Sequence, residues 1–457
     1  MERQRMVRPS VQSVGRMPFY SPSRVVVAGF GLVAVGGAVL LMLPVATAEG
    51  QSQGFVTALF TAMSAVCVTG LAIHDTGAHW SLFGQTTIMV LFQIGGFGIM
   101  TLASLLALIA SGRLGLRARL TAQAETKSPS PGNVRSVVAG VAVATLIIES
   151  VVAVILTARF AFGYGESFGS ALYSGIFHSI SAFTNAGFAL YPDSMTRYAT
   201  DPWVTLPVAG AVVAGGLGFP VLFTLRKAWH RPSRWDLHSK ITVGASAVLV
   251  AGGTVAIAVI EWGNPGTLGR LPESARLMAA FFHTVNTRSG GLNSVDIGQM
   301  DDNSWLISDV LMFIGAGSGS TGGGIKVTTF ALLGFVILAE LRGEPDVNVG
   351  HRRIPTQLQR QAITITLLSL GTVVAGTIIL MILTPFPLDR VLFEVISAAC
   401  TVGLSTGITA DVEAPGHLVL TALMFIGRIG PMTLGTALAL HVRTRRYQLP
   451  EDRPLVG

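Results

Sequence analysis

Four short glycine-containing segments recur along the chain, and their chemistry suits a dehydrated cation. Each segment has one glycine at the same place, and a phenylalanine stands ten residues before it. The glycines are Gly70, Gly187, Gly291 and Gly403, and the phenylalanines are Phe60, Phe177, Phe281 and Phe393. Rings of backbone carbonyls can replace the hydration shell of an ion, and glycine reaches backbone angles that are closed to other residues. We therefore predict a selectivity filter with one strand from each segment.

The predicted filter strands supply backbone carbonyls to K⁺, with no catalytic residue among them. They comprise Val66, Cys67, Val68, Thr69, Gly70, Phe183, Thr184, Asn185, Ala186, Gly187, Thr287, Arg288, Ser289, Gly290, Gly291, Ala399, Cys400, Thr401, Val402 and Gly403. The alternative is that the four glycines only let helices pack closely. The phenylalanines in the same register favour a filter, because a repeat of this kind marks a repeated architecture.

The surroundings of each glycine predict the elements that would position it. A long apolar segment precedes a short apolar stretch that ends near the glycine, and a second long apolar segment follows. The short stretch cannot span a bilayer, so we expect a re-entrant half-helix. The predicted fold is an all-α integral membrane protein with four pseudo-symmetric repeats around one pore. Each repeat has an outer helix, a pore half-helix, a filter loop and an inner helix.

The repeats can be assigned boundaries from the same pattern. Eight long helices are expected at 24–44, 85–111, 136–158, 204–226, 240–260, 305–340, 360–383 and 418–441. The repeats then occupy 24–111, 136–226, 240–340 and 360–441, between a cytoplasmic N-terminal segment, 1–23, and a cytoplasmic tail, 442–457. The inner segments of the first and fourth repeats also align, since Ile94–Leu102 matches Ile426–Leu434.

Composition and charge support a membrane protein. Half of the 457 residues are hydrophobic, 12% are charged and the mean hydropathy is +0.60. Most of the 31 lysines and arginines fall in the termini and three loops, which the positive-inside rule places in the cytoplasm. This distribution accounts for the net charge of +7 without a nucleic-acid partner. The first apolar run is longer than the core of a signal peptide, so we expect no cleavage there.

The third inner segment is interrupted by a glycine-rich run that we predict to be a gate. The gate residues are Gly315, Gly317, Ser318, Gly319, Ser320, Thr321, Gly322, Gly323, Gly324, Lys326 and Arg428. A helix does not tolerate so many glycines, and irregular backbone at membrane depth must line a cavity or pack on protein. The run differs from a phosphate-binding loop because Ile325 separates its last glycine from Lys326, so we expect no nucleotide there.

Several polar residues fall within predicted membrane helices or filter segments, and each has a functional and a structural interpretation. Arg428 replaces a glycine of the other inner segments, and an intramembrane charge is a functional candidate. We expect it to hydrogen-bond the glycine-rich run as a barrier, or else to form a structural ion pair. Glu149 requires a partner that the sequence does not identify. His178 and His283 on the half-helices are expected to pack in the core or to form hydrogen bonds, and Cys67 and Cys400 near the filter are expected to be small buried residues.

These motifs resemble the Trk/Ktr/HKT superfamily of K⁺ transporters over nearly the whole chain, and most closely its bacterial KtrB type. The resemblance implies K⁺ uptake across a bacterial cytoplasmic membrane, with Gly70 retained where serine is associated with Na⁺ preference. It implies a homodimer in lipid on a separate cytoplasmic nucleotide-binding ring of the RCK type, with no cofactor in this chain. It also places a gating loop at the glycine-rich run, and a supporting role for Arg288 behind the filter.

Alternative functions remain at this point. A Na⁺/K⁺ symporter, or a Na⁺-permeable relative, would use similar residues. An intramembrane enzyme would need a metal motif or paired carboxylates, which the predicted spans do not show, and a scaffold would leave the repeats unexplained. Most of the 24 acidic residues fall in the segments predicted to face outward, where a negative potential would concentrate cations.

Overall fold

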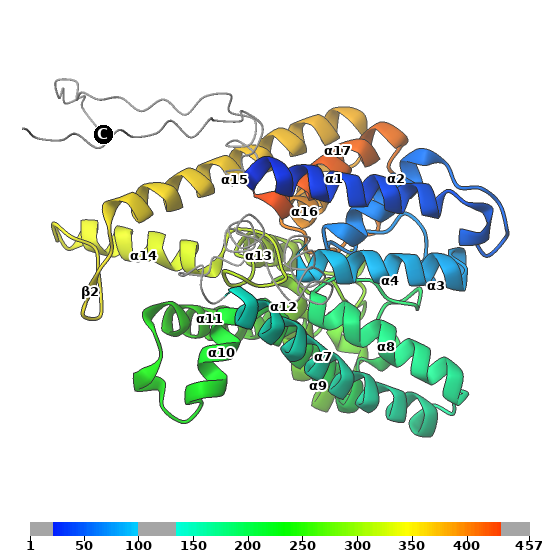
Figure 1. Ribbon diagram of the computed structural model, residues 1–457, viewed down its shortest axis with the longest axis horizontal. Coiled ribbons are helices and arrows are strands. Elements are labelled where there is room, and N and C mark those ends of the chain that lie inside the picture. Colours follow the sequence, from blue (N-terminus) through cyan, green and yellow to red (C-terminus); the bar gives the residue numbers. More distant parts are fainter. Residues whose placement is uncertain (1–21, 99–133, 431–457) are drawn as a thin grey trace, which may run out of the picture.

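The computed structural model describes residues 22–98 and 134–430, and these form four units of the same order (Figure 1). The outer helices are α1 (Pro22–Leu41), α7 (Val134–Ala158), α11 (Leu237–Glu261) and α15 (Thr356–Leu383). The half-helices are α2 (Phe55–Val66), α8 (Phe168–Thr184), α12 (Glu273–Thr287) and α16 (Leu388–Ala399). The inner segments are α4 (Leu82–Phe97), α9 (Pro202–Leu217) with α10 (Phe219–Ala228), α13 (Asp302–Phe313) with α14 (Val327–Leu341), and α17 (Ala414–Ile429).

Short elements join these helices. A single helical turn, α3 (Thr76–His79), follows the first filter segment, and β1 (Asn348–Val349) pairs with β2 (Arg352–Arg353) between α14 and α15. Figure 1 shows the β hairpin and the end of α10 at one end of the molecule, with α3 and the start of α8 at the other. The polar loops thus lie at the two ends of an apolar helical body.

The half-helices differ in length from one repeat to another. The stretches of about ten residues expected from the sequence correspond to helices of 12 residues in α2 and α16, but 17 in α8 and 15 in α12. The N-cap hydroxyl of Ser167 accepts a hydrogen bond from the backbone N–H of Ser170, which extends α8 beyond its apolar part. All four helices end just before a filter glycine.

The inner segments are less continuous than the sequence suggested. The helix expected over 204–226 is bent by 105° between α9 and α10, so that prediction was wrong. Gly218 occupies the break with a φ of +91°, a conformation that costs other residues energy. The interruption expected in the third repeat is present, between α13 and α14. The helices expected over 85–111 and 418–441 were also too long, because α4 ends at Phe97 and α17 at Ile429, where Gly98 and Gly430 have φ angles of +77° and +87°. The rest of these two predicted ranges lies outside the described residues.

Long spanning helices are fewer than the eight expected. Among the described residues, three helices are long and apolar enough to cross a membrane by themselves: Val137–Gly163, α11 and α15. The bent pair α9 and α10 could make a fourth span, and shorter apolar helices account for the rest. Short, broken inner helices place irregular backbone at the middle of the fold, where it must be buried in protein or line a cavity.

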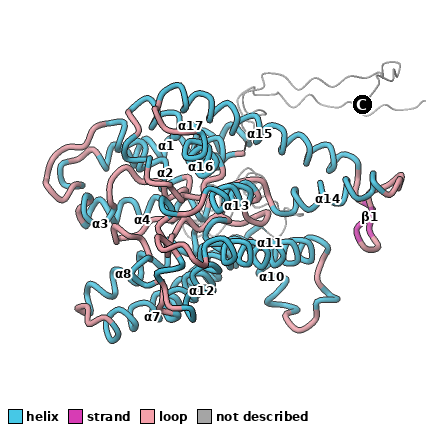
Figure 2. The backbone as a smooth tube through the Cα atoms, turned by 180° about the vertical axis from the view of Figure 1, so that it is seen from behind, coloured by secondary structure: helices cyan, strands magenta, loops and turns pink. Residues whose placement is uncertain are grey.

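The core joins the half-helices to the inner helices. In Figure 1, α1, α2, α15, α16 and α17 lie in the upper half and α7 to α12 in the lower half, while α13 lies between them; Figure 2 shows the same order from behind. Phe60, Phe177 and Phe393 are fully buried. In the third repeat Phe282 is buried instead, and Phe281 is only half-buried. The repeat phenylalanine thus has a packing role in three repeats.

Candidate ion pathway and gate

The four filter segments meet in the interior, as expected from the sequence. A Cβ atom added to Gly187 would lie 3.1 Å from the Cα of Gly291 and 3.3 Å from the Cα of Gly70. A Cβ added to Gly403 would lie 3.0 Å from the Cα of Gly70. The backbones are therefore so close at this point that no side chain fits between them. Segments more than 300 residues apart in sequence come together around one axis.

The filter strands share an unusual backbone conformation. Each of the four glycines has a φ between +71° and +96°. Two residues earlier, Val68, Asn185 and Thr401 also have positive φ angles of 57°, 60° and 51°. Non-glycine residues with such angles are uncommon and cost energy unless the surroundings impose them. The repeated strain at equivalent places shows that three strands share the same backbone conformation.

The third strand departs from this pattern. Ser289 has a φ of 154° where its counterparts are near 55°. The backbone carbonyl of Asn286 accepts hydrogen bonds from the N–H groups of Ser289, Gly290 and Gly291. In the first strand, the corresponding bonds are spread over Ala65 and Ser64. The filter is thus pseudo-symmetric rather than fourfold symmetric.

All four half-helices direct their C-terminal ends at the filter. Their last residues, Val66, Thr184, Thr287 and Ala399, each lie three or four positions before a filter glycine. The C-terminus of a helix carries partial negative charge and unsatisfied carbonyls. Four such ends around one axis would favour a cation there. Buried hydroxyl groups of Thr69, Ser289 and Thr401, which have no described hydrogen-bond partner, add further oxygen atoms to these strands.

Glycines in three inner helices allow this close approach. A Cβ atom at Gly95, Gly215 or Gly427 would collide with a backbone carbonyl at the end of the half-helix in the same repeat. The carbonyls are those of Val66, Phe183 and Ala399, each four residues before a filter glycine. The sequence marked these glycines as a repeat, and the structure adds that they have no room for a side chain.

The glycine-rich run lies against the filter, where a gate was expected. The guanidinium of Arg288 donates a hydrogen bond of 3.1 Å to the carbonyl of Gly315, at the start of the run. The backbone of Gly317 donates to the carbonyl of Gly216 on α9, at 2.8 Å. A Cβ atom at Gly322 would collide with Ser289, and one at Gly323 with Thr401. The run therefore packs between the inner helices and the third and fourth filter strands.

Two cations hold the same run. Lys326 donates a hydrogen bond of 2.5 Å to the carbonyl of Gly322. Arg428 donates to the carbonyl of Thr321 in the run and to that of Gly95 on α4. The expected contact between Arg428 and the run is therefore present. It joins the first, third and fourth repeats.

Polar side chains on two half-helices support the chain beyond the filter. Hydrogen bonding was one of the two roles expected of His178, whereas Glu394 was not among the expected site residues. The carboxylate of Glu394 accepts hydrogen bonds from the side chains of Ser405 and Thr409 and from the N–H of Thr406. The Nε2 atom of His178 lies 3.1 Å from the N–H of Leu190 and accepts from it. Both residues stand nine positions before a filter glycine. The same position holds Thr61 in the first repeat and Phe282 in the third, so a polar residue recurs there in three of the four repeats.

Other polar residues have the structural roles expected of them. Glu149 receives hydrogen bonds from the amide of Gln93 on α4, which supplies its partner. His283 lies 3.1 Å from the hydroxyl of Ser308 and is buried. Cys67 and Cys400 are free and buried.

Not all of the acidic residues counted on the outer face can attract cations there. Glu261, Asp201 and Asp309 are buried rather than exposed at a mouth. Glu261 accepts hydrogen bonds from Asn264, Thr267 and the N–H of Asp301. Asp201 pairs with Arg159 at 2.7 Å. The number of acidic residues in the outward-facing segments therefore overestimates the negative potential at the outer face.

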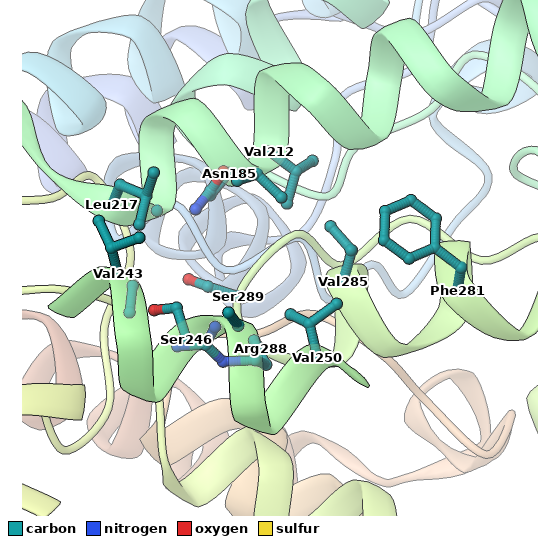
Figure 3. A pocket seen from close by; sticks show the side chains of 14 residues that line it. Asn185, Val212, Leu217, Val243, Ser246, Val250, Phe281, Val285, Arg288 and Ser289 are labelled. Atoms are coloured by element: carbon teal, nitrogen blue, oxygen red, sulfur yellow. The ribbon is translucent and has the colours of Figure 1, made fainter. Parts of the chain in front are cut away.

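An apolar cavity of about 280 Å³ lies beside the filter, between α9, α11 and α12 (Figure 3). Val212, Val250 and Phe281 line it, together with Arg288 and Ser289. Because its walls are almost entirely apolar, it offers too few oxygen ligands for a cation. Its lining includes Asn185, Arg288 and Ser289, which belong to the predicted filter strands of the second and third repeats.

Comparison with known proteins identifies the family. Residues 16–445 match the TrkH family, described as "Cation transport protein". The chain belongs to the TrkH family of cation transport proteins. Members of this family are membrane transporters, which agrees with the apolar helices of the described chain and makes it a multi-pass membrane protein.

Individual TrkH-family relatives cover almost the entire chain. The Ktr system potassium uptake protein B of Bacillus subtilis is 40% identical over 91% of this chain and 92% of its own length. The protein of the same name from Vibrio alginolyticus is 39% identical over 95% of this chain and 94% of its own. The crystal structure of the potassium transporter TrkH from Vibrio parahaemolyticus has the same fold, with a TM-score of 0.73 at 18% identity, over 93% of this chain and 86% of that one.

Proposed function

We propose that this protein takes up K⁺ through the axis where Gly70, Gly187, Gly291 and Gly403 meet. The observation that carries the proposal is the convergence of four filter strands, three of them with the same strained residue, at the C-terminal ends of four half-helices. Carbonyl oxygens on these strands replace water around the ion. The half-helix ends supply a negative potential without placing an ionised side chain in its path. The names of two relatives, potassium uptake proteins, support K⁺ as the ion.

The glycine-rich run between Gly315 and Gly324 serves as the gate in this proposal. It lies under the third and fourth filter strands and is held by Arg288, Lys326 and Arg428. Three cations near the path also repel K⁺ while the run is in place. Opening requires that these hydrogen bonds exchange for others, because carbonyls at membrane depth cannot be left unpaired at low cost.

The assembly expected from the sequence forms part of the same proposal. The chain would act as a homodimer in the bacterial cytoplasmic membrane, with both termini in the cytoplasm. A ring of separate nucleotide-binding chains would regulate it. The support is the positive-inside distribution of basic residues and the phrase "Ktr system" in the names of relatives, which implies more than one component.

A second candidate is transport of both K⁺ and Na⁺. A relative from Enterococcus hirae, named potassium/sodium uptake protein NtpJ, is 34% identical over 96% of this chain and 97% of its own length. Glycine at position 70 favours K⁺ over this alternative, because a side chain there would change the shape of the ion site.

Both candidates can be tested in one system. The protein is reconstituted in liposomes, and uptake of K⁺ and of Na⁺ is measured separately and together. The K⁺ proposal expects K⁺ uptake without Na⁺ and little Na⁺ uptake alone. Na⁺-dependent K⁺ uptake would favour the second candidate. Growth of a K⁺-uptake-deficient strain at low external K⁺ provides the check in cells, and absence of K⁺ movement in both assays would refute the proposal.

A further inference from the structure

We propose that Ser64 and Ser397 are positioning residues that orient filter carbonyls and so set the preference for K⁺ over Na⁺. The two serines stand on half-helices α2 and α16, six residues before Gly70 and Gly403. This inference rests on the proposed function, since it assigns a source of selectivity to the same filter. Neither serine was among the expected site residues.

The contact is the same in both repeats. The hydroxyl of Ser64 accepts a hydrogen bond from the backbone N–H of Gly70 at 3.1 Å. The hydroxyl of Ser397 accepts one from the N–H of Gly403 at 3.0 Å. Both serines are fully buried. The two glycines are part-buried, and the serine hydroxyl is the hydrogen-bond partner of each glycine N–H in the described structure.

The consequence for the ion follows from the geometry of the peptide bond. In a trans peptide, the N–H of one residue and the C=O of the residue before it point to opposite sides of the chain. The N–H of Gly70 points back to the half-helix, so the carbonyl of Thr69 points away from it. The carbonyl oxygen of Thr69 lies 3.2 Å from a Cβ atom added to Gly187. It therefore faces the other strands, where the ion would bind.

The fourth repeat has the same arrangement. The peptide that carries the N–H of Gly403 also carries the carbonyl of Val402. That carbonyl is the atom nearest to a Cβ added to Gly291. The hydroxyl of Ser397 thus holds the Val402 carbonyl toward the axis. Each serine acts on the ion through one peptide group and does not touch it.

The other two repeats use different contacts. In the second repeat, the hydroxyl of Ser181 donates a hydrogen bond of 2.7 Å to the carbonyl of Phe188, which lies beyond the filter glycine. In the third repeat, Val285 has no hydroxyl, and Asn286 accepts from the N–H of Leu292 at 3.3 Å. The first and fourth strands are therefore the two whose filter carbonyls are oriented by a serine hydroxyl.

Selectivity depends on such orientation because K⁺ and Na⁺ differ in size. A filter whose carbonyls are held in place resists the contraction that Na⁺ requires, while freely rotating peptides can adapt to either ion. Loss of one neutral hydrogen bond typically changes an equilibrium by about fivefold. We therefore expect each serine to contribute a change of about that size to the preference for K⁺.

The test substitutes the serines and measures ion preference rather than rate alone. Ser64→Ala, Ser397→Ala and the double variant are reconstituted in liposomes, and the permeability ratio of K⁺ to Na⁺ is measured. The matched control is Ser304→Ala on α13, since Ser304 is also fully buried but its hydroxyl has no described hydrogen-bond partner. Ser64→Cys retains a side chain of similar volume with a weak hydrogen-bond acceptor. It tests the same contact if the alanine variant does not fold.

The proposal expects each alanine variant to transport K⁺ with a ratio reduced by about fivefold. The double variant should fall further, Ser64→Cys should be intermediate, and Ser304→Ala should match the parent protein. Unchanged ratios in both single variants, or an equal fall in Ser304→Ala, would overturn it. If the parent protein carries no K⁺, the proposed function fails instead. A variant that loses all flux and also unfolds at lower temperature counts against a positioning role.

Discussion

Arg428 in α17 donates a hydrogen bond to the backbone carbonyl of Thr321, in the glycine-rich run of the third repeat. The same guanidinium reaches the carbonyl of Gly95 on α4. One side chain therefore joins three of the four repeats directly beside the filter. This contact would have to break or exchange if the run moves, which makes it the first target for substitution.

Replacing Arg428 with glutamine should raise K⁺ flux several-fold. The substitution removes a positive charge from the path and weakens the hold on the run, because a neutral amide donates weaker hydrogen bonds than a guanidinium. Flux of K⁺ into liposomes is the measurement. Arg353→Gln, which removes an exposed cation paired with Asp346 at 2.8 Å, is the control and should leave flux unchanged. Equal flux in Arg428→Gln and the parent would discard the barrier.

Replacing Gly70 with serine should lower the preference for K⁺ over Na⁺. Gly70 has a φ of +94°, and an added Cβ would lie 2.8 Å from the Cα of Gly187. The strand must therefore shift, and the carbonyls around the ion move with it. Competition between K⁺ and Na⁺ for uptake is the measurement. Gly50→Ser provides the comparison, since Gly50 also has a positive φ but has open space around it. A similar change in both variants would contradict a specific effect at the filter.

Replacing Glu394 with glutamine should reduce K⁺ flux, because the chain just beyond the filter loses its carboxylate support. A hydrogen bond to a charged group contributes about 1.5–3 kcal/mol, so the thermal stability should fall as well. Glu261→Gln is the matched control. Glu261 is equally buried and also accepts from two side chains and one backbone N–H, but it lies at the end of the outer helix α11 and not on a half-helix.

The two glutamate variants separate support of the filter from general stability. Both should unfold at a lower temperature than the parent protein. Only Glu394→Gln should lose flux at a temperature where both proteins remain folded. Parallel losses of flux and stability in the two variants would show that Glu394 has no role beyond folding.

Acid should destabilise the outer end of the second repeat through Asp201. Burial by itself raises the pKa of Asp201, but hydrogen bonds from Arg159 and Tyr164 outweigh it and hold the pKa below the ordinary value of 3.8. A carboxyl group with a depressed pKa stabilises the fold above its unfolded-state pKa, and the contribution is lost as the pH falls through the folded-state value.

Thermal unfolding measured from neutral pH down to about pH 3 would check this expectation. The unfolding temperature of the parent protein should fall below about pH 4. The Asp201→Asn variant should unfold at a lower temperature than the parent at neutral pH, and its unfolding temperature should change less as the pH falls. Asp193→Asn serves as the comparison, because its pair with Arg197 is more exposed and surface pairs contribute little. An identical acid profile in Asp201→Asn and the parent protein would exclude the pair as the cause.

The sequence by itself determined the repeated architecture, the family and the position of the interrupted helix. Phenylalanine and glycine at a constant separation mark each half-helix and its filter strand. Glycines in a run cannot continue a helix, so the break near Gly315 was visible too. These features were readable because hydrophobicity, spacing and glycine content act locally along the chain.

The tertiary structure alone decided which residues support the filter and how the repeats differ. The bend at Gly218, the contact of Arg428 with Thr321 and the support from Ser64 and Glu394 depend on groups that meet only after folding. Asp309 and Glu261 look like outer-face acids in sequence but are buried. The type of a residue determines which hydrogen bonds its side chain can make. The packing of segments that are distant in the chain determines which partner it meets.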